Sequence, residues 1–373
     1  MSSLWESGYK IEPEVRIKVR DFVEQHLTRD SQPIVLITSG GTMVPLERNV
    51  VRFIENFSAG TRGSASAELT EYAVIFLYRR NSFVPYGRRF LRGLNLTECF
   101  QVDTSGPAPV VQIDPRKVPN ASKWVLAYQQ AMMRKRLLLI EFTTVGEYLA
   151  KLAYISRQLT HFGRRALLYL AAAVSDFYIP DEEMPVHKMQ SSEGPVHLTL
   201  KLVPKMLGAL VTEIVKEAFV VSFKILDILF ILHILDLLEN LEYRMPRNGV
   251  MFHGFELSER SSSVINEMEN GGWSSSISLT TELERSESSE IKLETDPSIL
   301  IPKCKDSLKK YSHQLVIGNI LEDRKVEVFF VTHDAVEPIR LQDKVTDENE
   351  EIEHFIVERL VFLHREHMAV NTS

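Results

Sequence analysis

SGGTMVPLERNVVRFIENFSAGTRG, at residues 39–63, joins a buried strand to the start of a helix. It follows the apolar run IVLIT at residues 34–38, and it ends in glycines as a short helical segment, residues 63–71, begins. A strand, glycines and a helix start form a common phosphate site in α/β proteins, because free backbone N–H groups and the helix dipole both favour an anion. Glycine spacing alone is also compatible with a loop that merely turns the chain.

Three polar side chains lie between these glycines. Arg52 offers a charged fork suited to a phosphate, whereas Asn56 and Ser58 can hydrogen-bond a reacting group. The alternative for Arg52 is a surface ion pair with Glu47 or Glu55.

Outward from this stretch, strand patterns alternate with helix patterns. We expect strands at residues 34–38, 72–78, 138–142, 166–174, 219–223, 315–317 and 326–332, and helices at residues 12–27, 63–71, 121–137, 144–160, 297–310 and 350–366. Such alternation predicts an α/β fold, a mostly parallel doubly wound, Rossmann-like sheet with flanking helices. Residues 186–203 alternate in polarity and predict a protruding hairpin.

Composition narrows the class of protein. The 373 residues are 44% hydrophobic, enough for a real core, and the net charge of −7 argues against nucleic-acid binding. Cys99 and Cys304 are the two cysteines, which fits a reducing, cytoplasmic location and no zinc site. No secretory signal is visible at the N-terminus. The most apolar run, residues 225–238, is too short to span a membrane.

Two regions interrupt the regular pattern. Residues 225–291 separate a strand from a helix, with an apolar part that predicts a helix and a serine-rich part that predicts a disordered loop. We expect residues 1–224 and 292–373 to form a single domain into which this insertion falls. Residues 81–119 are expected to be loop and exposed connection, with Arg88, Arg89 and Arg92 on a solvated surface.

Four blocks of sequence stand at the ends of expected strands, the edge where open α/β sheets bind ligands. They contain SGGT, PLE, VRFIENFSAGTRG, LYLAAAVSDFYIP, HKMQSS, LVPKML, VSFK and a later IGN. Together and in this order, they resemble the eukaryotic phosphopantothenoylcysteine synthetase family, over residues 12–224 and 293–364. The resemblance implies a ligase that joins 4′-phosphopantothenate to L-cysteine in coenzyme A biosynthesis, through an acyl-nucleotidylate.

The resemblance also implies roles for individual residues. The nucleotide would be held by Gly40, Ser58, Gly60, Gly63, Phe223 and Asn319. Phosphopantothenate would be held by Asn56, Ala172, Ala173 and Asp176, with Arg52 reaching its phosphate from the neighbouring subunit of a homodimer. Asn56 would also serve the chemistry as an oxyanion donor, and Lys188 would neutralise the phosphate under attack.

The family resemblance implies ATP as the nucleotide, with CTP left open, and Mg²⁺ carried by the triphosphate rather than by a dedicated protein cage. One alternative is a catalytically weak homologue that binds phosphopantothenate but has a nucleotide site disrupted by the insertion. Another is a nicotinamide-dependent dehydrogenase, which is disfavoured because no GxGxxG follows the first strand. No nucleic-acid or membrane partner is expected.

Overall fold

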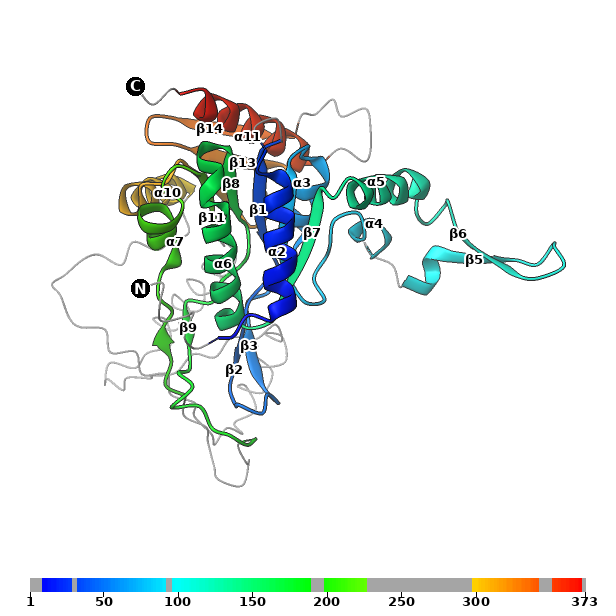
Figure 1. Ribbon diagram of the computed structural model, residues 1–373, viewed down its shortest axis with the longest axis horizontal. Coiled ribbons are helices and arrows are strands. Elements are labelled where there is room, and N and C mark those ends of the chain that lie inside the picture. The colour runs from blue at the N-terminus through cyan, green and yellow to red at the C-terminus, as the bar shows by residue number, and fades with distance from the viewer. Residues whose placement is uncertain are drawn as a thin grey trace, which may run out of the picture.

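The computed structural model describes residues 9–28, 32–91, 96–188, 198–226, 297–341 and 351–370. Within these ranges, the centre of the protein is an eight-stranded sheet in the order β14-β13-β12-β11-β8-β1-β4-β7 (Figure 1). Its strands are β1 (Ile34–Ser39), β4 (Ala73–Arg79), β7 (Leu137–Phe142), β8 (Ala166–Leu170), β11 (Phe219–Leu226), β12 (Leu315–Ile320), β13 (Glu327–Val331) and β14 (Val336–Arg340).

The sheet is parallel from β12 to β7, and β13 and β14 are antiparallel additions at one side. The predicted α/β class and the mostly parallel sheet are therefore confirmed. Ile34 of β1 pairs with Ala73 of β4 on one side and with Ala166 of β8 on the other. Since parallel neighbours end at the same edge, the residues that follow β1, β8 and β12 gather at one carboxyl edge, beside the last residues of β11.

Helices cover both faces of this sheet, as the nearly continuous burial of its central strands requires. The apolar side chains of α2, α6 and α7 form one core cluster with β1, β4 and β8, and those of α3, α5 and α11 form a second on the opposite face. A third cluster packs α10 on β12. The helices are α2 (Pro13–His26), α3 (Thr61–Leu69), α4 (Arg88–Leu91), α5 (Ala121–Met133), α6 (Val145–Leu159), α7 (Met206–Ala209), α10 (Pro297–Tyr311) and α11 (Ile352–Ala369), with short segments η1 (Leu96–Cys99), η2 (Thr160–Arg165) and η4 (Leu210–Ile214).

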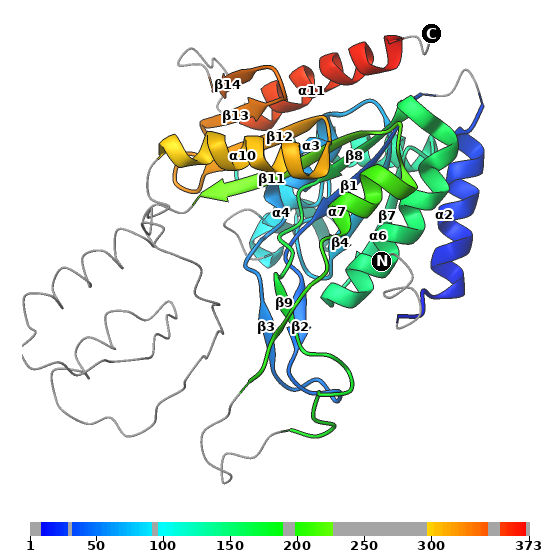
Figure 2. The ribbon, with the colours of Figure 1, turned by 90° about the vertical axis from the view of Figure 1, so that its left-hand side faces the viewer.

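Beyond the carboxyl edge, two small antiparallel sheets project from the body (Figure 2). One pairs β2 (Met43–Pro45) with β3 (Phe53–Glu55), and the other pairs β9 (Phe177–Tyr178) with β10 (Lys201–Leu202). The prediction of a hairpin at residues 186–203 was wrong in its bounds, because its paired base starts earlier, at Phe177. Residues 189–197 of that prediction lie outside the described residues.

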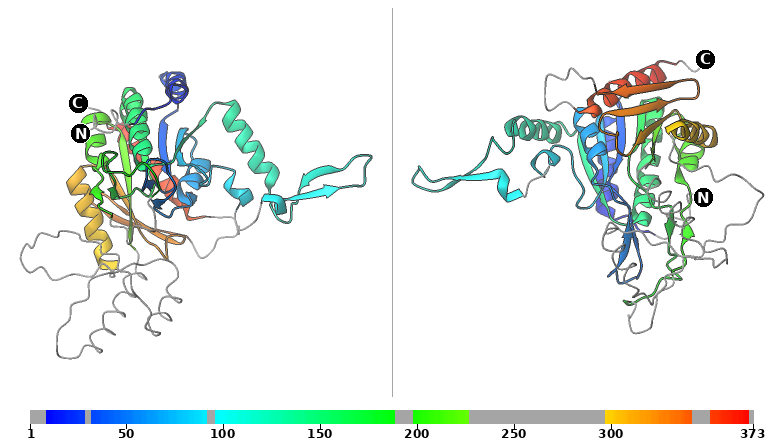
Figure 3. Two further views of the ribbon diagram at one scale, coloured as in Figure 1. Left: turned by 90° about the horizontal axis from the view of Figure 1, so that it is seen from below. Right: turned by 180° about the vertical axis from the view of Figure 1, so that it is seen from behind.

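The prediction of loop and exposed connection at residues 81–119 was right in that residues 100–113 are largely exposed, but wrong in that they are not loop. Residues 96–119 contain a second hairpin, β5 (Phe100–Asp103) and β6 (Val110–Ile113), which extends away from the main body (Figure 3). Its register places Phe100 opposite Ile113 and Val102 opposite Val111, so apolar cross-strand pairs stabilise the hairpin. The prolines and glycines around it led to the prediction of loop.

β11 continues beyond its predicted end at Phe223. Ile225 pairs with Asn319 and Leu226 with Ile320, so the first two residues of the predicted insertion belong to the sheet. Residues 227–291 lie outside the described ranges, and their helix-plus-loop organisation stays a prediction. In the part of the chain that is described, no helix combines the length and the apolar character needed to cross a membrane.

Candidate active site

The glycines of the first motif converge where β1 ends and α3 begins. Gly60 is the N-cap of α3 with φ of +78°, a left-handed conformation that side chains rarely adopt. A Cβ on Gly63 would lie 2.6 Å from Ser39 Oγ, and one on Gly60 would lie 3.4 Å from the Gly40 amide nitrogen. Ser39 Oγ also donates a hydrogen bond to the Gly60 carbonyl at 3.1 Å. We call Gly40, Gly60 and Gly63 the near wall of the site. Ser58, which is half-buried, lies two residues before Gly60.

The second motif lies against the first through backbone hydrogen bonds. Ala173 N donates to Gly40 O at 2.9 Å, and Thr42 N donates to Ala173 O at 2.9 Å. Asn56 N in turn donates to Thr42 O at 3.1 Å. The structure thus brings together Asn56 and Ala173, with Ala172 adjacent, from segments more than 100 residues apart in sequence. Ala172 and Ala173 are half-buried at this strand end.

A chain of side-chain hydrogen bonds fixes Asn56. Ser175 Oγ donates to Asn56 Oδ1 at 2.6 Å, and Thr42 Oγ1 donates to Ser175 Oγ at 3.2 Å. The backbone N–H of Ser175 donates to Thr42 Oγ1 at 2.9 Å. Ser175 and Thr42 are both buried. Both residues lie within the sequence motifs, but the sequence predicted no role for either. The contact between them depends on how the two segments align in the folded chain.

Asp176, the residue after Ser175, contacts a partner that the sequence did not predict. Its carboxylate forms an ion pair with Lys205 Nζ, which comes from the LVPKML motif. Both side chains are more than half exposed, so the pair contributes little to stability and both groups remain accessible to a ligand.

Arg52 pairs with Glu47 of its own chain. Arg52 Nη2 lies 2.7 Å from Glu47 Oε1, and the Arg52 backbone N–H donates to Glu47 Oε2 at 3.0 Å. The Glu47 side chain is fully buried, whereas that of Arg52 is 38% exposed. The alternative of an ion pair with Glu47 is confirmed, although the acid is buried rather than on the surface. Glu55 pairs instead with Arg79, at 3.0 Å.

Lys188 is exposed and is the last residue described before residues 189–197. The segment before it is bound to the turn between β2 and β3, because Arg48 N donates to Pro185 O at 2.8 Å and Asn49 N donates to Val186 O at 3.2 Å. Lys188 therefore belongs to the same projecting part of the protein as Arg52.

Phe223 in β11 and Asn319 near the end of β12 form what we call the far wall. Tyr169 of β8 lies between the walls: its ring packs edge-on against Phe223 at 4.9 Å, and its hydroxyl lies 3.0 Å from Ser66 Oγ in α3. Asn319 is 2% exposed, and its Oδ1 has no hydrogen-bond partner within the described part of the chain. A buried amide oxygen of this kind requires a donor, and a nucleotide could supply one.

Of the predicted site residues, the near wall and Asn56 with Ala172 and Ala173 form one contiguous group. Tyr169 connects Phe223 to α3, the helix that follows the near wall, and Asn319 lies in β12, which pairs with β11. Arg52 and Lys188 lie on the projecting part. Across the described ranges, no group of three or more histidine, cysteine, aspartate or glutamate side chains could hold a metal ion.

Comparisons with known proteins agree on one family. No family model matches the chain. The phosphopantothenate–cysteine ligase of Homo sapiens is 35% identical over 338 residues, covering 89% of this chain and 86% of the human protein. The ligase CAB2 of Saccharomyces cerevisiae is 32% identical over 375 residues, covering 94% of this chain and 81% of the yeast protein.

Solved structures give the same result. A Cab2 mutant superposes with a TM-score of 0.73 at 31% identity, covering 100% of this chain and 99% of the other. A Cab2 mutant in complex with phosphopantothenate-cysteine superposes with a TM-score of 0.71 at 31% identity, covering 98% of each chain. Sequence and fold thus match over nearly the whole length, and this chain belongs to the phosphopantothenate–cysteine ligase family.

Proposed function

We propose that this protein condenses 4′-phosphopantothenate with L-cysteine through an acyl-nucleotidylate, a step of coenzyme A biosynthesis. The observation that carries this proposal is the meeting of the near wall with Asn56 and Ala173 at one sheet edge, in a chain that spans 86% of the human ligase. A phosphate-suited turn then adjoins an amide donor, which is the arrangement that carboxylate activation needs.

The reaction balances in two steps. A carboxylate oxygen of phosphopantothenate attacks the α-phosphorus of the nucleotide, the α–β anhydride bond breaks, and pyrophosphate leaves. The cysteine amine then attacks the acyl carbon and loses one proton to solvent as the amide forms, and the nucleoside monophosphate leaves with the former carboxylate oxygen. Asn56 donates a hydrogen bond to the oxyanion that develops in the second step, and Lys188 offsets the negative charge that develops at phosphorus in the first.

The two walls suit a nucleotide. Open backbone N–H groups and the start of α3 favour its phosphates, and the unpartnered Asn319 Oδ1 is placed to accept from its base or sugar. We assign the nucleotide to Gly40, Ser58, Gly60, Gly63, Phe223 and Asn319. ATP is the proposed nucleotide, CTP is the competing choice, and Mg²⁺ would be held mainly by phosphate oxygens and water.

Phosphopantothenate is assigned to the other half of the site. Ala172 and Ala173 leave room for its backbone, Asn56 and Asp176 offer polar contacts, and Arg52 is proposed to reach its phosphate from the neighbouring subunit. The Glu47 carboxylate orients the Arg52 guanidinium but leaves part of it exposed, as a phosphate contact requires.

A homodimer is proposed on the projecting part of the protein. Phe53, Ile54 and Phe57 are exposed there, with 92% of Phe57 accessible, and Phe177 and Leu202 of the neighbouring small sheet are exposed as well. Clustered exposed apolar side chains on a structured element usually mark an interface. We propose that a second copy of this chain covers these side chains, because Arg52, which is proposed to reach the neighbouring subunit's site, lies directly before Phe53. A cytoplasmic location is proposed with it, on the ground that the buried Cys99 and Cys304 are not joined in a disulfide.

Pyrophosphate release tests the proposal. Purified protein with ATP, Mg²⁺ and phosphopantothenate is expected to release pyrophosphate, and cysteine should raise the rate and yield phosphopantothenoylcysteine by mass spectrometry. Omission of phosphopantothenate is the control. Binding of phosphopantothenate without any pyrophosphate release, with ATP or with CTP, would favour the catalytically weak homologue instead.

A further inference from the structure

Arg62 occupies the first turn of α3, between the near-wall residues Gly60 and Gly63. It makes two contacts with distant parts of the chain. Its Nη1 lies 3.2 Å from Glu353 Oε1 in the first turn of α11, and its Nη2 donates to the carbonyl of Arg324. The Arg62 and Glu353 side chains are 16% and 11% exposed, so little solvent screens the pair.

The Arg324 carbonyl connects Arg62 to the far wall. Arg324 lies in the turn between β12 and β13, five residues after Asn319, and its own guanidinium donates to the Leu321 carbonyl in that turn. Arg62 thus runs from the helix of the near wall to the turn that follows the far wall. Two strands, β8 and β11, separate β1 from β12 in the sheet, so this side chain links parts of the site that are not neighbours in it.

A cation in the first turn of a helix is unfavourable, because the helix dipole places positive charge there. Glu353 offsets that cost, and the planar guanidinium can serve a carboxylate and a carbonyl at once, which a lysine ammonium cannot do with the same geometry. The residue type and its two contacts therefore indicate a defined position rather than a solvated surface cation.

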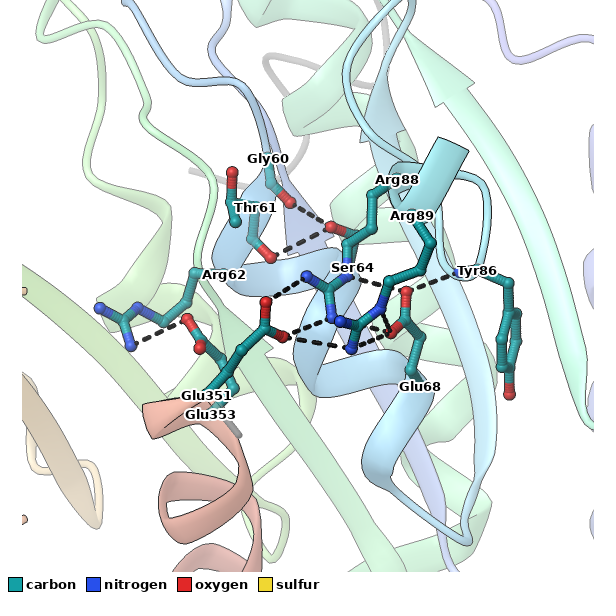
Figure 4. A network of polar contacts seen from close by, with 10 residues as sticks. All are labelled: Gly60, Thr61, Arg62, Ser64, Glu68, Tyr86, Arg88, Arg89, Glu351 and Glu353. Carbon is teal, nitrogen blue, oxygen red and sulfur yellow. Dashed lines mark hydrogen bonds and ion pairs between the residues drawn. The ribbon is translucent and has the colours of Figure 1, made fainter. Parts of the chain in front are cut away.

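A second link between α3 and α11 lies at the other end of α3 (Figure 4). Glu68, in its last turn, accepts from Arg88 Nε and Nη2, both at 2.8 Å. Arg88 Nη2 also lies 2.6 Å from Glu351 Oε2, and Arg89 contacts both acids at 3.2 Å. We call Glu68, Arg88, Arg89 and Glu351 the clamp. Arg88 and Glu68 are each only 2% exposed in their side chains, so the predicted solvated surface for Arg88 and Arg89 was wrong; Arg92 lies outside the described residues.

The two links differ in where they act. The clamp ties the last turn of α3 to the start of α11, on the opposite end of α3 from the glycines. Arg62 acts inside the near wall itself. We propose that Arg62 is a positioning residue that sets the separation of the near and far walls and hence the fit of the nucleotide, whereas the clamp only fastens α3 to α11. This inference rests on the proposed function, since it refines the nucleotide half of that site.

Substitutions on the two links separate these tasks. Arg62→Gln should raise the nucleotide KM about tenfold or more, because small displacements of a binding group cost large factors. The KM values for phosphopantothenate and cysteine should stay within about twofold. Arg62→Lys keeps the charge but cannot hold both contacts, so it should restore part of the loss. Glu353→Gln should change the nucleotide KM in the same direction as Arg62→Gln, and less strongly.

Glu351→Gln is the matched control, because it neutralises the acid at the N-cap of α11, two residues before Glu353 but within the clamp. It should lower Tm by a few degrees and leave the nucleotide KM within about twofold. The proposal is overturned if Arg62→Gln raises all three KM values alike while lowering Tm, or if Glu351→Gln changes the nucleotide KM as much as Arg62→Gln does.

Direct binding of ATP, by equilibrium dialysis of wild type and Arg62→Gln, keeps this test separate from the proposed function. If wild type binds ATP but ligates nothing, the proposed function fails, and weaker ATP binding by Arg62→Gln still supports the positioning role. Equal nucleotide binding by both proteins, or no binding of either ATP or CTP by wild type, overturns it.

Discussion

The Ser175 hydroxyl donates a 2.6 Å hydrogen bond to the side-chain carbonyl of Asn56. Because Oδ1 is occupied in this way, the amide is held with its NH₂ group as the part left to donate to a substrate. Thr42 donates to Ser175 behind it, so the chain of donors runs towards Asn56. This order of hydrogen bonds favours Asn56 as the oxyanion donor of the second step.

The two steps should separate in variants of the proposed catalytic residues. Asn56→Ala should slow amide formation about 10²–10³-fold, the usual cost of an oxyanion donor, so that acyl-nucleotidylate accumulates. Lys188→Gln should block formation of that intermediate. Quantifying the intermediate by mass spectrometry after rapid quenching decides between these outcomes. Equal amounts in the two variants would contradict the division of roles.

Ser175→Ala tests whether the hydrogen bond from Ser175 to Asn56 contributes to the rate of the second step. It removes the hydroxyl that orients the Asn56 amide but leaves Asn56 in place, so it should slow the second step less than Asn56→Ala does.

Arg52 should matter for one substrate only. Arg52→Gln should raise the Kd for phosphopantothenate about ten- to a hundredfold, because a charge-assisted hydrogen bond is worth about 1.5–3 kcal/mol. Glu47→Gln leaves the cation but removes its orienting partner, so a smaller loss in the same direction is expected. Calorimetric titration with phosphopantothenate and, separately, with ATP measures both. An unchanged affinity for phosphopantothenate in Arg52→Gln would exclude the role.

Acid should destabilise the protein through His364. Burial lowers the pKa of this imidazole to about 4, and its Nε2 bonds the Arg164 carbonyl while its Nδ1 faces the Tyr72 hydroxyl, which fixes the neutral form. The unfolded chain, with a histidine pKa of about 6.5, binds the proton first. Stability is therefore full above about pH 6.5 and falls towards pH 4, by up to about 1.4 kcal/mol per pH unit for one proton.

Urea unfolding at several pH values checks this expectation. His364→Gln should be less stable at pH 7.5 but should lose less stability than wild type between pH 6.5 and pH 4. The exposed His161 is the matched control, and His161→Gln should keep the wild-type slope. A wild-type slope in His364→Gln would assign the acid sensitivity to other groups.

The sheet was predictable because its parallel strands are apolar at nearly every position. β1 is buried along all six of its residues, as a strand covered on both faces must be. β14 was missed, since an edge strand with Pro338 and the charged residues Glu337 and Arg340 carries no such pattern. Arg88 was misassigned because its partners, Glu68 and Glu351, lie 20 and 263 residues away in sequence. The motifs located the site, but the hydrogen bonds of Ser175 and Arg62 depend on tertiary register.

Deletion of residues 225–292 tests the predicted insertion. The deletion joins SFK to LETD, so that Leu293 and Glu294 would take the register positions of Ile225 and Leu226 beside β12. A long connection costs little in loop-closure entropy, about 0.6 kcal/mol per doubling of its length, so its removal recovers only a small amount through this term. We expect higher Tm or solubility with ligase activity kept or improved, measured against the full chain. Unfolding or complete loss of activity would make the segment integral to the domain.

The fate of the carboxylate oxygen tests the central claim most directly. The protein is incubated with ATP, Mg²⁺, cysteine and phosphopantothenate that carries ¹⁸O in both carboxylate oxygens. The masses of the products are then measured by mass spectrometry. Attack on the α-phosphorus predicts one ¹⁸O in the phosphate of AMP and one in the amide carbonyl of the product. Label in inorganic phosphate with unlabelled ADP, or no product with either ATP or CTP, would contradict ligation through an acyl-nucleotidylate.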